Sequence, residues 1–341
     1  MLNRSVEGIK LRGGMSKTLH QKEDIEILAS EDPGIGLPGR VKLPGYSRTM
    51  GPQTHLFAER ERLQGLKWQH FDVQQLSPTV GAELIGVDLT QELPQQVIDE
   101  IQQALWDYKV IFFRDQLITS EQHVNFASRF GKLEIHPFLP PNTETPELVR
   151  FEKNDKAGGY ENQWHHDVTW RNTPSRGAIL RAVEVPPVGG DTLFVDAHAA
   201  YGGLDQETKD LIDDLVATHD FFRAFARQVP DEKKKEIREQ YPIVEHPVVI
   251  NHYQTGKPLL YVNRIFVTGI KGWEQKPSFE LLDLLCREFE VLEYSCRFRW
   301  EPNSIAFWDN QAVQHYATSD YSPHRRVMER ASIKGAQPAR G

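Results

Sequence analysis

The chain has 341 residues, more than the roughly 100–200 of a typical single domain, although barrels and sandwiches with inserted helices reach this length as one unit. Its mean hydropathy is −0.53, and no apolar run approaches the roughly 20 residues that cross a bilayer, which excludes a membrane-spanning protein. The formal net charge of −8 argues against a nucleic-acid partner, so an anionic substrate requires a cation within its own site.

The cysteines and the N-terminus indicate the cellular compartment. Cys286 and Cys296 are too few for a disulfide scaffold, and the N-terminal sequence MLNRSVEGIKLRGG contains no apolar segment of a signal peptide. We therefore expect a cytoplasmic protein.

Residues 1–67 differ in composition from the rest of the chain. They contain eleven basic and eight acidic residues although the chain as a whole is acidic, and glycine and proline are scattered through them without a sustained hydrophobic period. We expect an irregular N-terminal arm, either disordered or packed on a neighbouring subunit of a homo-oligomer. One domain is expected to follow at 68–341.

The first part of this domain is predicted to mix strands and helices. A short strand at 83–89 precedes Pro94, a residue favoured at the start of a helix, and apolar residues then recur at helical spacing up to Tyr108. A buried strand is expected at 110–113. Thr119 and Gln122 have the spacing of a capping box at the start of a further helix.

Strand patterns dominate the rest of the chain, where helices are predicted only at 205–217 and 277–289. The predicted strands are 148–151, 163–170, 178–185, 192–195, 247–252, 258–262, 294–300, 305–308 and 327–333. Many short strands with glycine and proline turns favour a mainly β fold with inserted helices (α+β). They indicate a sandwich or jelly-roll barrel and argue against an alternating α/β sheet.

The predicted strand 163–170 carries the first candidate metal ligands. Residues two apart in a strand share a face, so His165 and Asp167 are expected to point together. One imidazole and one carboxylate, completed by a distant histidine, form a facial triad that binds Fe(II) and leaves positions open for O2 chemistry.

The same His-x-Asp spacing occurs a second time, in His70-Phe71-Asp72. That pair lies at the end of the arm and has no matching downstream histidine. We interpret it as a pair of surface polar residues, and the choice of His165 depends on its context.

A third ligand is expected on a different strand of the barrel. His315 follows the run Trp308-Asp309-Asn310, and Arg326 comes eleven positions after His315. A lone histidine is more often structural, but an arginine at this distance can reach the same cavity and hold a carboxylate through two hydrogen bonds. His315 is therefore our candidate for the third ligand.

Four motifs stand in the chain in a fixed order. They are Trp164-His165-His166-Asp167-Val168-Thr169, Gly189-Gly190-Asp191-Thr192-Leu193, Trp308-Asp309-Asn310 with Gln314-His315-Tyr316, and Arg325-Arg326-Val327-Met328-x-Arg330. With them, roughly residues 76–334 resemble the Fe(II)- and 2-oxoglutarate-dependent dioxygenases of the taurine dioxygenase type, a family that includes alkylsulfatases and phenoxyalkanoate dioxygenases.

The resemblance implies a double-stranded β-helix in which His165, Asp167 and His315 bind Fe(II). It also implies that Thr192 and Arg326 hold the far carboxylate of the co-substrate 2-oxoglutarate. The threonine hydroxyl can donate a hydrogen bond to a carboxylate oxygen. The family reaction uses O2 to hydroxylate a substrate carbon and converts 2-oxoglutarate to succinate and CO2.

The resemblance further implies that Arg330 and His136 bind the substrate sulfonate, as the matching residues do in the taurine-type enzymes. The chain departs from the taurine pattern where Leu139 stands in place of a tyrosine. Near the position of an amine-contacting asparagine it has Glu161 followed by Asn162, which makes Asn162 a candidate substrate contact.

Leu139 and Phe266 suit a more apolar substrate tail than that of taurine. We expect a small anionic organic substrate, first of all a sulfonate that is hydroxylated with release of sulfite. An alkyl sulfate ester, or a phenoxyalkanoate or other carboxylate, is the alternative. A zinc hydrolase and a non-catalytic jelly-roll binding protein also remain open, although neither requires Thr192 and Arg326.

Overall fold

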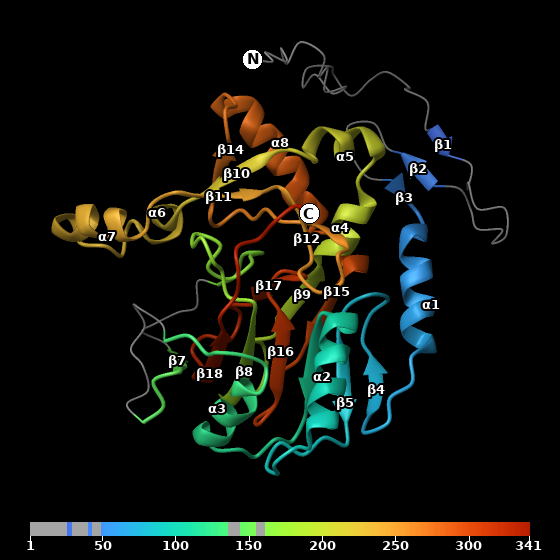
Figure 1. Cartoon of the computed structure of the whole chain (residues 1–341), viewed down its shortest axis with the longest axis vertical. Coiled ribbons are helices and arrows are strands. Elements are labelled where there is room, and N and C mark those ends of the chain that lie inside the picture. Colours follow the sequence, from blue (N-terminus) through green and yellow to red (C-terminus); the bar gives the residue numbers. More distant parts are fainter. Residues whose placement is uncertain (1–25, 29–39, 43–48, 136–143, 155–160) are drawn as a thin grey trace. The chain divides into compact units, whose positions relative to one another are not determined.

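The chain divides into two units, Met1–Thr54 and His55–Gly341. The computed structural model describes residues 26–28, 40–42, 49–135, 144–154 and 161–341 (Figure 1). In the first unit the strands β1 (Glu26–Leu28), β2 (Arg40–Lys42) and β3 (Thr49–Met50) pair antiparallel in that order. Part of the expected arm thus forms paired strands, and most of the rest of this unit lies outside the described residues.

The boundary between the units lies earlier than the expected boundary after residue 67. Residues 55–67 belong to the second unit, where helix α1 (Phe57–Gly65) packs Leu63 into the core with 1% of its surface exposed. The sequence pattern missed this helix because four of its nine residues are charged and Leu63 alone is buried within it.

A seven-stranded sheet forms the centre of the second unit. All its neighbouring strands pair antiparallel except β5 and β6, which are parallel. The strand order is β4 (Asp72–Gln75), β5 (Ala82–Ile85), β6 (Val110–Phe113), β16 (Ile305–Asp309), β8 (Gly177–Glu184), β18 (Arg326–Ile333) and β7 (Leu148–Lys153). Segments that are far apart in the sequence therefore lie side by side.

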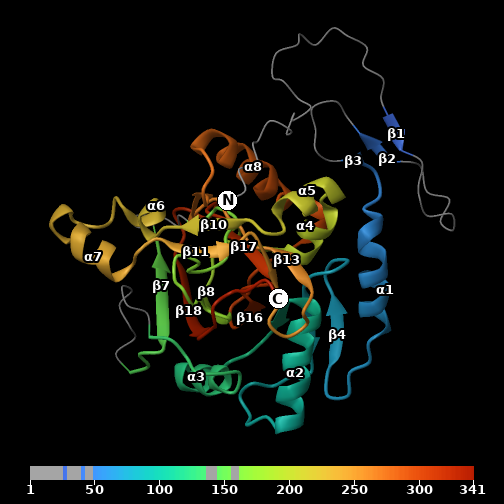
Figure 2. The same cartoon turned by 45° about the horizontal axis from the view of Figure 1, so that its top comes forward.

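Helices cover one face of this sheet. Ile111 and Phe113 of β6 pack into a cluster with residues of α1, α2 (Gln95–Tyr108) and α3 (Ser120–Ser128), and α2 and α3 lie on the same side of the sheet in Figures 1 and 2. Both helices begin where the sequence predicts. Pro94 immediately precedes α2, and the capping box of Thr119 and Gln122 is confirmed.

A second sheet faces the other side of the large sheet. Its strands are β15 (Ser295–Phe298), β9 (Thr192–Asp196) and β17 (Val313–Ala317), all antiparallel. The ring centroids of Phe194 and Phe298 lie 5.6 and 4.0 Å from that of Phe112, which comes from the large sheet. Because successive strand residues alternate sides, Phe112 faces this sheet while Phe113 faces the helices. The mainly β fold with inserted helices is confirmed.

The remaining elements extend beyond the two sheets, and α6 and α7 project to one side (Figures 1 and 2). The helices are α4 (Ala197–Gly203), α5 (Gln206–Ile212), α6 (Phe221–Phe225), α7 (Lys234–Gln240) and α8 (Gln275–Glu288), with single 3-10 turns at Thr54–Leu56, Asp231–Lys233 and Leu292–Tyr294. The strands form the sheet β11 (Val244–Pro247), β10 (Val216–His219) and β14 (Val267–Ile270), and the pair β12 (Val249–Asn251) and β13 (Pro258–Leu260). No described helix is long and apolar enough to span a membrane.

One predicted element is wrong in part and another is absent. The helix predicted at 205–217 ends at Ile212, and Val216–His219 is instead the central strand β10, with Ala217 and His219 buried on alternate positions. The strand predicted at 163–170 is absent. His165 forms one β-bridge, and the chain then turns at Val168, whose φ of +50° is incompatible with an extended strand.

Candidate functional site

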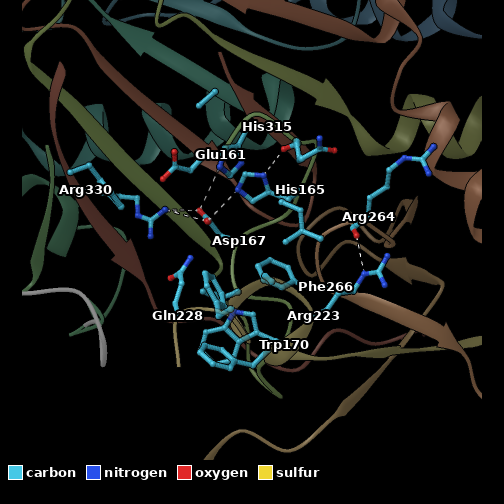
Figure 3. Close-up of a pocket in the computed structure, with 18 of the residues that line it drawn as sticks. Glu161, His165, Asp167, Trp170, Arg223, Gln228, Arg264, Phe266, His315 and Arg330 are labelled. Carbon is cyan, nitrogen blue, oxygen red and sulfur yellow. Dashed lines mark hydrogen bonds and ion pairs between the residues drawn. The ribbon is translucent and has the colours of Figure 1, made fainter. Parts of the chain in front are cut away.

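The three side chains predicted as metal ligands converge in the structure (Figure 3). The Nε2 atoms of His165 and His315 each lie 3.9 Å from an oxygen of Asp167. One potential ligand atom of each residue lies within 4.8 Å of the other two, and the described residues contain no other such group of His, Cys, Asp or Glu. Two imidazoles and one carboxylate match the ligand set of non-heme Fe(II).

The two histidines are held together by their backbones. His165 N donates to His315 O at 3.2 Å, and His315 N donates to His165 O at 2.9 Å. This bridge attaches the loop of His165 to strand β17, which carries His315 in the second sheet. The ring centroids lie 4.2 Å apart as a result.

Asp167 reaches the histidines through a turn and not through a strand. Its backbone N–H donates to Asn310 Oδ1 at 2.7 Å, and Asn310 Nδ2 donates to Asp167 O at 3.0 Å and to Ser175 O at 2.8 Å. A β-branched residue with positive φ, such as Val168, costs about 1–3 kcal/mol and persists only where its surroundings fix it. The fully buried amide of Asn310 supplies that fixation.

The histidine protonation states suit metal binding. His165 Nδ1 lies 2.7 Å from Gln163 O, and because a carbonyl can only accept, the neutral tautomer that fits this contact has its proton on Nδ1 and its lone pair on Nε2. Burial, together with the neighbouring His165, lowers the pKa of His315 to about 3, so this ring is neutral near pH 7.

Arg330 lies against the same carboxylate. Its Nη1 is 3.2 Å from Oδ1 and 3.1 Å from Oδ2 of Asp167, and its guanidinium carbon lies 4.9 Å from the centre of the Phe151 ring. Burial by itself raises the pKa of Asp167, but Arg330 and the two histidines hold that pKa below its usual value. Asp167 is therefore ionised and available as a ligand.

Thr192 and Arg326, which the sequence predicts to hold a carboxylate, line the same cavity as His165, Asp167 and His315. Arg326 is 8% exposed, its Nε and Nη2 have no hydrogen-bond partner among the described residues, and burial lowers its pKa. Gly190 leaves room for it, since a Cβ there would stand 3.3 Å from Arg326 Cδ and Nε. A buried guanidinium without a partner is costly, so this cradle suits an anion such as the far carboxylate of 2-oxoglutarate.

Comparison with known proteins matches residues 72–332 to the family described as taurine catabolism dioxygenase TauD, TfdA family. The chain belongs to this family. It is 34% identical over 275 residues to an alpha-ketoglutarate-dependent sulfate ester dioxygenase of Pseudomonas putida, covering 78% of this chain and 90% of that protein. It is 33% identical over 277 residues to an alkylsulfatase of Acinetobacter baylyi, covering 78% and 86%. The crystal structure of a taurine dioxygenase from Burkholderia xenovorans aligns with a TM-score of 0.69 at 35% identity, covering 79% and 91%.

The resemblance stated from the motifs is confirmed. This protein is an iron- and 2-oxoglutarate-dependent dioxygenase of the TauD, TfdA family, with His165, Asp167 and His315 able to hold the metal. The zinc hydrolase and the non-catalytic binding protein that the sequence left open do not agree with this membership.

The metal ligands, Thr192 and Arg326 open into one cavity of about 1230 Å³ in this dioxygenase. A second part of the cavity is formed by the turn after Asp167, the segment of α6 and α7, and the loop before β14, and it is largely apolar apart from Arg223, Gln228, Lys233 and Arg264 (Figure 3). The apolar side chains that line it are Val168, Trp170, Phe221, Ala224, Phe225, Val229, Pro230, Ile237, Ile265 and Phe266.

The structure places the other predicted site residues as follows. Arg330 and Phe266 line the cavity, whereas Asn162 does not, although its neighbour Glu161 does. His136 and Leu139 lie outside the described residues. The second His-x-Asp pair lies at the surface: His70 is 38% exposed at its side chain and its Nδ1 lies 2.6 Å from Glu100 Oε2.

Sequence reasoning did not assign a role to Asn310 or to the aromatic residues of α6. Asn310 stood in a quoted motif, but its partner Asp167 is 143 residues away, which no local pattern reveals. The run Phe221-Phe222-Arg223-Ala224-Phe225 is a signal that could have been noticed, because three aromatic residues in five, shortly before a strongly charged segment, require an apolar partner.

Replacing Asn310 tests whether its amide holds the turn that carries the metal ligand Asp167. We expect Asn310→Ala to weaken Fe(II) binding about 10–100-fold, the usual effect of removing a group that orients a metal ligand. Fe(II) titration of the metal-free protein measures this. As a control, Asn125→Ala changes an exposed asparagine of α3 that does not line the cavity, and it should leave Fe(II) affinity unchanged. Unchanged affinity in Asn310→Ala would show that the turn keeps its shape without this amide.

Proposed function

We propose that this dioxygenase hydroxylates a carbon next to the anionic group of an organic sulfate ester or sulfonate that carries an apolar tail. The observation that carries this proposal is the composition of the cavity, in which Arg326 and Arg330 line the part that holds the metal ligands and a largely apolar region adjoins it. We also propose that the two facing sheets form the double-stranded β-helix that the resemblance implies.

His165, Asp167 and His315 hold Fe(II) in this proposal, and Thr192 and Arg326 hold the far carboxylate of 2-oxoglutarate. When bound, iron with 2-oxoglutarate and O2 supplies the oxidising power for C–H hydroxylation, with succinate and CO2 as the other products. The protein contributes by positioning the substrate. Its residues fix the reacting carbon near the metal and exclude water from the apolar part of the cavity.

The charges of the cavity favour an anion in an otherwise acidic protein. Of the described residues that line it, six are basic and two are acidic, although the chain carries a net charge of −8. The basic residues are Lys153, Arg223, Lys233, Arg264, Arg326 and Arg330, and the acidic ones are Glu161 and Asp167. Such a local excess of positive charge attracts an anionic substrate against the field of the whole protein.

Arg330 is the cation that we assign to the substrate anion. It lies beside the metal ligand Asp167, and its buried Nε has no hydrogen-bond partner among the described residues. Because Arg330 lines the cavity, we propose that its guanidinium donates to a sulfate or sulfonate oxygen next to the carbon that reacts. His136 is proposed as a second contact of the anion and Leu139 as a further substrate contact, and both remain predictions; Asn162, which does not line the cavity, is not retained as a contact.

The apolar region favours a hydrophobic tail and disfavours the ammonium group of taurine. Trp170, Phe221 and Phe266 are buried around it, and this region offers an ammonium no carboxylate partner. Two relatives described above are named for sulfate esters, which supports an alkyl sulfate ester beside the sulfonate expected from the sequence.

The products distinguish the two substrates. Hydroxylation of the carbon bound to the ester oxygen gives an unstable intermediate in which the C–O bond to sulfate breaks, leaving an aldehyde and hydrogen sulfate. Hydroxylation of the carbon bound to the sulfur of a sulfonate breaks the C–S bond, leaving an aldehyde and hydrogen sulfite. In both cases the carbon is oxidised by two electrons, and one oxygen atom of O2 is found in the aldehyde or its hydrate.

A panel of substrates tests the proposal. Linear alkyl sulfates, alkyl sulfonates, taurine and phenoxyalkanoates are compared by substrate-dependent succinate formation. Each buried methylene contributes ~0.8 kcal/mol, so KM is expected to fall up to about fourfold per added carbon until the apolar region is filled. Taurine as the best substrate, or a KM that does not depend on tail length, would contradict the assignment of an apolar tail. Phenoxyalkanoates as the best substrates would show that the substrate anion is a carboxylate and not a sulfate or sulfonate.

Arg330→Ala tests the anion contact. Each charge-assisted bond contributes ~1.5–3 kcal/mol, so KM for the best sulfate or sulfonate should rise about 10–150-fold, while an uncharged alcohol with the same tail is affected much less. Arg150→Ala is the matched control, because this arginine pairs with Glu329 and does not line the cavity. Equal losses for charged and uncharged compounds would show that Arg330 acts only through Asp167.

The homo-oligomer and the cytoplasmic location expected from the sequence remain predictions. Neither enters the argument for the reaction, because every residue used above comes from a single chain.

A further inference from the structure

The hydroxyl of Thr192 is held by a residue that does not line the cavity. Trp300, 5% exposed and just beyond β15, donates from Nε1 to Thr192 Oγ1 at 2.9 Å. Among the described residues, no other side chain donates a hydrogen bond to that oxygen. An indole N–H can only donate, so it occupies a lone pair of the hydroxyl and leaves the hydroxyl proton for another acceptor.

The same indole lies next to Arg326. The guanidinium carbon of Arg326 is 6.0 Å from the centre of the Trp300 ring, and its Nε and Nη2 have no partner in the described part of the chain. Thr192 and Arg326 both line the cavity, so the threonine proton and these two nitrogens are three donors without a protein acceptor among the described residues. A carboxylate, which is an acceptor only, satisfies all three.

The position of Trp300 is fixed by the core between the two sheets. Its ring meets Phe298 edge-on at 5.0 Å and 87°, and Phe298 stacks on Phe112 of the large sheet at 4.0 Å and 9°. The direction of the indole N–H is therefore set by both sheets before any ligand binds. This is preorganisation, which lowers the ordering cost of binding.

We propose that Trp300 is a positioning residue for the co-substrate: its indole N–H fixes the Thr192 hydroxyl as a donor toward the far carboxylate of 2-oxoglutarate. The proposal rests on the co-substrate site of the proposed function. Without the indole N–H, the hydroxyl can rotate and use its proton elsewhere, so the hydrogen bond to 2-oxoglutarate is lost for part of the time. Trp300 has no contact with the reacting atoms and acts through Thr192.

The test compares 2-oxoglutarate binding in variants that keep the shape of the site. Trp300→Phe keeps an aromatic ring against Phe298 but removes the N–H, and Thr192→Val removes the hydroxyl at nearly constant volume. The Kd of 2-oxoglutarate is measured without O2 by titrating the Fe(II)-loaded protein and following its visible charge-transfer band. We expect Trp300→Phe to raise this Kd about three- to tenfold, the range of one neutral hydrogen bond, and to leave the Kd of Fe(II) unchanged.

The double variant separates positioning from packing. In the Thr192→Val background, Trp300→Phe should cause no further change in Kd, because the hydroxyl that it orients is gone. Trp106→Phe is the matched control: it also removes an indole hydrogen bond, to Tyr253 Oη at 3.0 Å, outside the cavity. If Trp300→Phe does not fold, the sulfur isostere benzothienylalanine at position 300 keeps the ring shape and removes only the N–H.

Three results would overturn the proposal. They are an unchanged Kd in Trp300→Phe, an equal loss in both backgrounds, and an unchanged Kd in Thr192→Val. If the unaltered protein does not give the charge-transfer band, the proposed function is contradicted, and so is the role of Trp300 that depends on it.

Discussion

Substitution of His165, Asp167 or His315 by alanine is expected to reduce substrate turnover to the background rate. Removing a group that merely orients a ligand already costs about 10–100-fold, and each of these changes removes a ligand itself. The three ligand atoms lie within 4.8 Å of one another, so no remaining residue of the cluster can replace the missing one. Iron content after dialysis and substrate-dependent succinate formation measure the two consequences separately.

The chain provides a control with the same sequence spacing. His70→Ala and Asp72→Ala should leave turnover and iron content near those of the unaltered protein, because His70 is at the surface and contacts Glu100. Full activity in His165→Ala, or loss of activity in a folded His70→Ala, would mean that the wrong triad has been assigned.

Arg326→Met is expected to weaken 2-oxoglutarate binding at least about tenfold, because it removes charge-assisted bonds of ~1.5–3 kcal/mol each. The structure adds a second expectation. The guanidinium is buried and two of its nitrogens lack partners among the described residues, so an apolar side chain of similar length should make the ligand-free protein equally or more stable. The rise in Tm that 2-oxoglutarate causes should then largely disappear.

The adjacent arginine serves as the control for this experiment. Arg325 is 42% exposed at its side chain and pairs with Glu152 and Glu184 at the surface, so Arg325→Met should keep both the affinity for 2-oxoglutarate and the thermal shift. An Arg326→Met variant that binds 2-oxoglutarate as tightly as the unaltered protein would remove Arg326 from the co-substrate site.

The sequence predicted the elements whose signals are local. The capping box of Thr119 and Gln122 and the proline before α2 mark their helices correctly, since backbone donors at a helix start are satisfied within a few residues. The strand expected at 163–170 was wrong because the conformation of Val168 is imposed by Asn310, which is distant in sequence. Helix α1 was missed because its burial depends on a single leucine.

The candidate site was predictable in its ligands but not in its supporting contacts. His165 and Asp167 do converge, but they do so through a β-bridge to His315 followed by a turn, and not on one face of a strand. The ion pair of Arg330 with Asp167 and the bond from Trp300 to Thr192 join residues 163 and 108 positions apart. Such pairs follow from the pairing of strands across the two sheets, and one sequence contains no direct signal for them.

The stoichiometry of the products from a medium-chain alkyl sulfate tests the proposed oxidative reaction most directly. With Fe(II), 2-oxoglutarate and O2 supplied, we expect one succinate for each inorganic sulfate released, and no sulfate when either O2 or 2-oxoglutarate is withheld. Sulfate released without succinate would show hydrolysis and would contradict the oxidative reaction. Succinate formed without sulfate, sulfite or any other oxidised product from the panel would contradict the assignment of a sulfur-containing substrate.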